Sequence, residues 1–122
     1  MDLPFRYVMV GLIWLVAAMI EGLWMGIFGT TQYTPLHVIM VLTGGVTGIL
    51  FGTVLRAWSK VGSDPWANWQ FIAWNIGVLI TAIGAIVRTW GHGDAVIAIG
   101  SIVMLVATLM LLVMFQRGGK QA

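Results

Sequence analysis

The chain contains no cysteine, and only 8% of its 122 residues are charged. Without cysteine it can form no disulfide, no thiolate metal site and no cysteine-ligated iron–sulfur cluster. A soluble domain carries about 25% charged residues, so the scarcity of charge argues against a soluble protein. The formal net charge of +2 is also too small to indicate a nucleic-acid partner. These absences together favour a protein whose partner is the lipid bilayer.

Apolar residues are what the chain has in abundance, at 60% of the sequence. They fill four runs, at about residues 5–28, 36–58, 68–90 and 95–115. A hydrocarbon core about 30 Å thick is crossed by about 20 apolar residues in a helix, and continuous apolar runs argue against a β-barrel. The sequence therefore predicts an all-α fold, with residues 1–122 forming one transmembrane four-helix bundle. The short connections predict an up-down-up-down order.

The basic residues predict the orientation of the bundle. Only Arg88 lies near the ends of the spans that border the turns at 29–35 and 91–94. The other basic residues all fall at the opposite ends: Arg6, Arg56, Lys60, Arg117 and Lys120. By the positive-inside rule, both termini are expected in the cytoplasm. We therefore expect a multi-pass protein of the inner (cytoplasmic) membrane.

Four polar residues near the outer ends of the spans are the candidates for chemistry: Glu21, His37, Arg88 and His92. Glu21 is expected about 10 Å below the outer end of its span. An ionisable group at that depth is costly and by default indicates a functional site. The alternative is structural, with Glu21 pairing with Arg88 or hydrogen-bonding a neighbouring helix.

A glycine stripe follows His37 along the second span, at Gly44, Gly48 and Gly52. Glycines four residues apart in a membrane helix usually indicate close packing of another helix. A second interpretation is that His37, Gly44 and Gly48 share one helix face and form a groove for a porphyrin. Gly11 stands outside any such stripe, so it is expected to tolerate a larger side chain better than Gly48.

A similar strip of small residues descends from His92 along the third span, at Ala85, Thr81 and Gly77. Arg88 lies one helical turn below His92, where its guanidinium could pair with a heme propionate. The plainer interpretation is that Arg88 and His92 extend to the water at the membrane surface.

Three kinds of site are compatible with these residues. The first is heme b, with His37 or His92 as an axial ligand and Arg88, Gly44 and Gly48 around the porphyrin. The second is a small metal ion held by His37, His92 and Glu21. The third is a quinol pocket whose histidine and carboxylate relay protons. The sequence contains no hydrolase or phosphate-loop motif.

The stretch from His37 to Arg56 also resembles a known family. It is similar to the second span of small four-helix bacterial proteins described as cytochrome c oxidase subunit I-like, which resemble a fragment of the heme-copper oxidase and nitric oxide reductase catalytic subunit. Further matches are Asn75, Gly77, Gly91 and His92, and the resemblance covers about residues 22–116. It departs at Ile39 and Gln70, where the family usually has histidine. The resemblance implies a respiratory membrane and a heme.

Two functional hypotheses follow. In the first, the protein is a small accessory subunit of the respiratory electron-transfer apparatus that binds heme b near the outer face and works with a quinol or redox partner. In the second, it is a cofactor-free structural or assembly subunit of a larger membrane complex or of a homo-oligomer. In the second case the glycine stripes are assembly faces.

Overall fold

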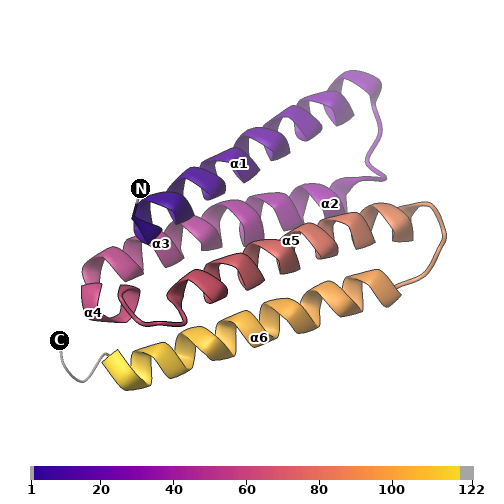
Figure 1. Ribbon diagram of the computed structural model, residues 1–122. Coiled ribbons are helices and arrows are strands. Elements are labelled where there is room, and N and C mark those ends of the chain that lie inside the picture. Colours follow the sequence, from indigo (N-terminus) through magenta and orange to yellow (C-terminus); the bar gives the residue numbers. More distant parts are fainter. Residues whose placement is uncertain (1, 119–122) are drawn as a thin grey trace.

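Four long apolar helical segments make up the computed structural model of the protein, which describes residues 2–118 (Figure 1). Each is long and apolar enough to cross a membrane, and they cover Leu3–Phe28, Thr34–Ala57, Ala67–Thr89 and Ala95–Gly118. No strand occurs among these described residues. The predicted all-α class with four membrane-spanning helices is therefore confirmed, and the segments lie within a few residues of the predicted ranges.

The first, third and fourth spans are single helices, and the second is composite. The single helices are α1 (Leu3–Phe28), α5 (Ala67–Thr89) and α6 (Ala95–Gly118). The second span consists of α2 (Thr34–Ile39), a π-helix η1 (Met40–Val46) and α3 (Thr47–Ala57). A short helix, α4 (Ser59–Gly62), follows it. The π-helical segment was not predicted from the sequence.

The ends of α1 follow from local chemistry. The Asp2 side chain accepts a hydrogen bond from the Phe5 backbone N–H at 3.0 Å, which satisfies one of the donors that a helix start leaves free. At the other end, Gly29 has a φ of 62° and its N–H donates to the Met25 carbonyl. Because residues with a side chain rarely adopt this φ, glycine ends the helix and begins the turn toward α2.

The spans pack as two hairpins, α1 with the second span and α5 with α6 (Figure 1). The hairpins meet mainly where α2 and η1 lie against α5. Two polar contacts place the end of one span beside the start of another. At one end Arg56 pairs with Asp2 at 2.9 Å, and at the other the Trp90 indole N–H donates to the Tyr33 hydroxyl at 3.0 Å. Which of these ends faces the cytoplasm stays a prediction.

Glycines set the closest approach of α1 to the second span. A Cβ atom added at Gly11 would lie 3.0 Å from the Gly45 carbonyl oxygen and 3.2 Å from the Ile49 nitrogen. At Gly48 the nearest atom would be the Gly11 Cα, at 3.7 Å. The premise that Gly11 stands apart was therefore wrong. It lies at the helix crossing and is packed more tightly than Gly48, because the backbones of both helices meet there.

The two outermost helices, α1 and α6, expose most of their apolar side chains. In their most apolar windows only 11% and 17% of residues are buried inside the protein, compared with 44% in α5. The hydrocarbon of a bilayer would cover these exposed side chains, since water has no favourable contact with them. The arrangement indicates contact with a lipid bilayer over a large part of the surface, as the composition predicted.

Candidate functional site

Glu21 and His37 form the main polar contact between α1 and α2 in the half of the hairpin that lies next to their connecting turn. Glu21 Oε2 lies 3.0 Å from His37 Nδ1. The Glu21 side chain is only 14% exposed, and that of His37 is 33% exposed. Of the two structural alternatives for Glu21, the structure shows the hydrogen bond to a neighbouring helix, and its partner is one of the two candidate histidines.

A residue that the sequence analysis missed, Gly22, makes room for this contact. A Cβ atom at Gly22 would lie 2.9 Å from Cε1 of the His37 ring. The imidazole therefore packs directly against the backbone of α1. A larger residue at this position would push the ring away from the carboxylate, since Cβ contacts this short essentially never occur. In the sequence, the available sign of this close contact was a glycine directly after Glu21.

The Glu21 carboxylate has one oxygen left over. Oε1 is buried and has no hydrogen-bond partner among the described residues. An unpartnered buried acceptor costs about 1–3 kcal/mol, and such groups in native proteins call for an explanation such as a water, an ion or a functional role. The pair is therefore a polar site with spare hydrogen-bonding capacity inside a membrane-spanning hairpin.

The contact also bears on the chemistry of the two imidazole nitrogens. When Nδ1–H donates to a carboxylate, the lone pair resides on Nε2, which is then the nitrogen that can bind a metal. Metal-binding histidines commonly have such a carboxylate on the other nitrogen, where it orients the ring and raises its basicity. In this geometry Glu21 is an orienting group for His37, whereas the metal hypothesis had placed it among the ligands.

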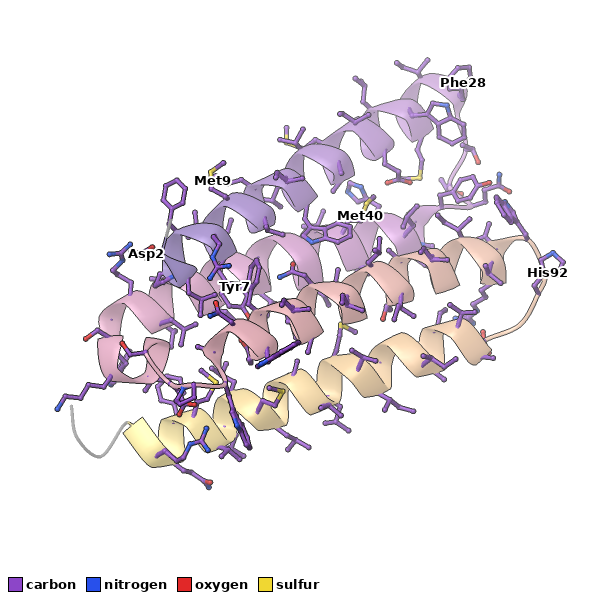
Figure 2. All side chains as sticks on the ribbon, viewed as in Figure 1. Asp2, Tyr7, Met9, Phe28, Met40 and His92 are labelled. Atoms are coloured by element: carbon purple, nitrogen blue, oxygen red, sulfur yellow. The ribbon has the colours of Figure 1, made fainter. Side chains whose placement is uncertain are left out.

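His92 and Arg88 do not join this pair. His92 is exposed in the turn between α5 and α6, as its label at the end of the molecule in Figure 2 shows. Arg88 Nε lies 3.1 Å from Asp94 Oδ1, and both side chains are largely exposed. Among the described residues, no group of three potential metal ligands occurs. The three predicted metal ligands, His37, His92 and Glu21, are thus not gathered at one point in a single chain.

The two strips of small residues are closed by neighbouring helices. A Cβ atom at Gly44 would lie 2.5 Å from Cγ of the Trp14 ring, so a tryptophan of α1 already covers the face predicted for a porphyrin. On α5, a Cβ atom at Gly77 would lie 2.9 Å from the Met104 nitrogen of α6. Both strips serve helix packing in the structure, which the plainer interpretation predicted for the stripe on the second span.

Three residues of α1 spaced seven apart each form a hydrogen bond to another span. Because seven residues are about two helical turns, Tyr7, Trp14 and Glu21 lie on one face of α1. Their partners are Gln70, Asn75 and His37, respectively. This spacing was visible in the sequence but was not recognised, because each residue was considered separately. These three hydrogen bonds attach an otherwise lipid-exposed helix to the other spans at three positions along its length.

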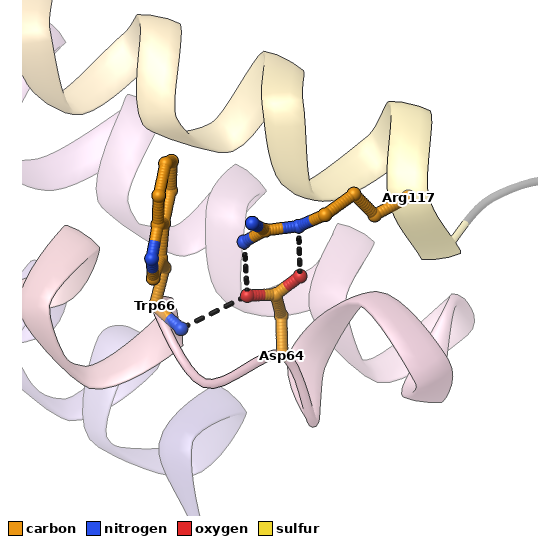
Figure 3. Close-up of polar contacts among 3 residues, drawn as sticks. All are labelled: Asp64, Trp66 and Arg117. Atoms are coloured by element: carbon orange, nitrogen blue, oxygen red, sulfur yellow. Dashed lines mark hydrogen bonds and ion pairs between the residues drawn. The ribbon is translucent and has the colours of Figure 1, made fainter.

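A second polar cluster lies at the opposite end of the protein, between the α4–α5 loop and the end of α6 (Figure 3). Arg117 contacts both carboxylate oxygens of Asp64, with Nε–Oδ2 at 3.1 Å and the second contact at 2.6 Å. The Arg117 guanidinium also lies 4.2 Å from the centre of the Trp66 ring. Paired donors and the aromatic face hold the guanidinium in one place. We assign this cluster to fastening α6 to the loop.

No family model, curated protein or solved structure matches the chain.

Proposed function

We propose that this protein is a small accessory subunit of the electron-transfer apparatus of the cytoplasmic membrane, and that His37, oriented by Glu21, is its working residue. The observation that carries the proposal is the contact of Glu21 Oε2 with His37 Nδ1 at 3.0 Å. It supports a histidine whose Nε2 is available as a ligand. The respiratory setting rests on the resemblance of the second span to the oxidase subunit I-like proteins.

Heme b is the cofactor that we propose for His37, and it would supply electron transfer when bound. The fit within one chain is partial. His37 is suitable as an axial ligand and is one-third exposed, whereas Gly44 and Gly48 are covered by α1. A heme would therefore be held at the surface of the helices, and a partner subunit or second copy would complete its pocket. Arg88 is not part of this proposal, because it pairs with Asp94.

The cofactor-free subunit is the second candidate, and the closed glycine strips favour it. Gly11, Gly44 and Gly77 all meet neighbouring helices of the same chain, so packing alone accounts for them. In this case the Glu21–His37 contact would hold α1 to α2 and bind nothing.

An optical spectrum of the protein, purified in mild detergent with its native partners, separates the two candidates. We expect a reduced heme b spectrum in the wild type, its loss in His37→Ala, and its retention in His92→Ala, because His92 is remote from Glu21. Glu21→Gln should retain heme at reduced occupancy. A colourless wild type, or full heme occupancy in His37→Ala, would contradict the proposal and favour the cofactor-free subunit.

A further inference from the structure

The second span changes its helical geometry between His37 and the glycine crossing with α1. The π-helix η1 occupies Met40–Val46, and its last hydrogen bond runs from the Thr47 N–H to the Leu42 carbonyl, five residues back. A π-helix therefore takes up more residues per turn than an α-helix, and such segments are rare and often occur at functional sites. The direction in which His37 points thus depends on whether this segment stays wide.

Side-chain donors form hydrogen bonds to two backbone carbonyls of the π-helix η1, which is wider than an α-helix. The Leu42 carbonyl also accepts a hydrogen bond from the Thr47 hydroxyl at 2.7 Å. The Thr43 carbonyl accepts one from the indole N–H of Trp74, at 3.2 Å. This last contact comes from α5, and Trp74 is only 6% exposed. In hydrocarbon no water is present to donate a hydrogen bond to a free backbone carbonyl. A donor from a neighbouring helix therefore stabilises an irregular helical segment.

We infer that Trp74 is a positioning residue, which holds η1 in its wide form through the Thr43 carbonyl and thereby directs His37 onto Glu21. The inference rests on the proposed role of the Glu21–His37 pair as the working site. The geometric reason is rotation about the helix axis. One residue of an α-helix corresponds to a rotation of about 100°. If η1 closed to an α-helix with all its residues present, the extra residue would rotate His37 away from Gly22 and the Glu21 carboxylate. No other helix contacts the π segment through a hydrogen bond that the described residues show.

The readout is the ¹⁵N resonance of His37 in protein labelled at histidine and reconstituted in lipid. The chain has only two histidines, so His92→Ala assigns the signal. Glu21→Ala supplies the reference for an imidazole without its carboxylate. We expect Trp74→Phe, which keeps an aromatic ring but loses the N–H donor, to shift the His37 Nδ1 signal toward that reference.

Two controls separate positioning from general loosening. Trp14→Phe removes an indole N–H bond of similar length, 3.3 Å, to the Asn75 side chain, and Val78→Ala opens the buried core of α5. Both should leave the His37 signal at its wild-type position. A wild-type His37 signal in folded Trp74→Phe would overturn the inference, as would equal shifts in all three variants.

A deletion supplies a rescue test. Leu42 is 53% exposed, so deleting it removes no core side chain. The deletion takes out the extra residue that the π segment accommodates, so the segment can close as an α-helix while His37 keeps its direction relative to α3. Combined with Trp74→Phe, the deletion should therefore return the His37 signal to its wild-type position. A signal that stays shifted in the folded double variant would contradict the inference; if that variant does not fold, Trp74→Phe alone decides. The signal reports a hydrogen bond and requires no heme, so a colourless protein would refute the proposed function while leaving this result readable.

Discussion

Gly100→Ala is expected to destabilise the protein by about 1–3 kcal/mol, the usual cost of forcing an extra group into a packed core. A Cβ atom at this position of α6 would lie 2.5 Å from the Thr81 backbone nitrogen and 2.9 Å from its Cα. Because these atoms belong to the backbone of α5, they cannot rotate away as the tip of a side chain could. The two helices must separate, although they pack against each other as extensively as α1 packs against the second span.

The matched control is Gly26→Ala on α1. A Cβ atom there would meet nothing within 4 Å, and alanine favours helix by about 1 kcal/mol over glycine. Unfolding in detergent or lipid, followed by circular dichroism, should give opposite signs for the two variants, with Gly26→Ala neutral or stabilising. Equal stability of the two variants would show that α5 and α6 are not in backbone contact.

Gln70→Met is expected to cost about 1–3 kcal/mol, because it leaves a buried hydroxyl without a partner. The Tyr7 hydroxyl donates to Gln70 Oε1, and Gln70 Nε2 donates to the Ala107 carbonyl at 3.3 Å. Both Tyr7 and Gln70 are fully buried. The glutamine thus joins α1, α5 and α6.

The double variant Tyr7→Phe with Gln70→Met provides the control. Replacing both partners with apolar groups leaves no unpaired hydroxyl, so the double variant should be more stable than the sum of the single effects predicts. The same unfolding measurement on the four proteins tests it. Strictly additive effects would mean that the Tyr7–Gln70 hydrogen bond does not form in the membrane.

The sequence was sufficient to predict the four spans, and to predict that Glu21 and His37 lie toward the same end of the bundle. Span positions depend on hydrophobic length, which is a local property. The contact between the two residues could only be listed as one alternative, since it depends on the crossing of α1 and α2. That crossing is set by Gly11 and Gly22, which were not recognised as packing positions in the sequence.

The convergence of His92 with His37 was expected from depth alone. Depth does not fix direction, and the turn that holds His92 is shaped by Gly91 and Gly93, which both have a φ of 86°. The π segment was also beyond prediction, because it depends on a donor from α5, Trp74, which the sequence places 31 residues away from Thr43.

A double-mutant cycle between Glu21→Ala and His37→Ala tests the central claim most directly. The free energy of unfolding in lipid should show a coupling of about 0.6–1.7 kcal/mol, from the average to the maximum that double-mutant cycles give for hydrogen bonds between membrane helices. The cycle of Glu21→Ala with His92→Ala should show none, since His92 lies in the exposed turn. Effects of Glu21→Ala and His37→Ala that add to within about 0.3 kcal/mol would contradict the account, because the two side chains would then not be in contact.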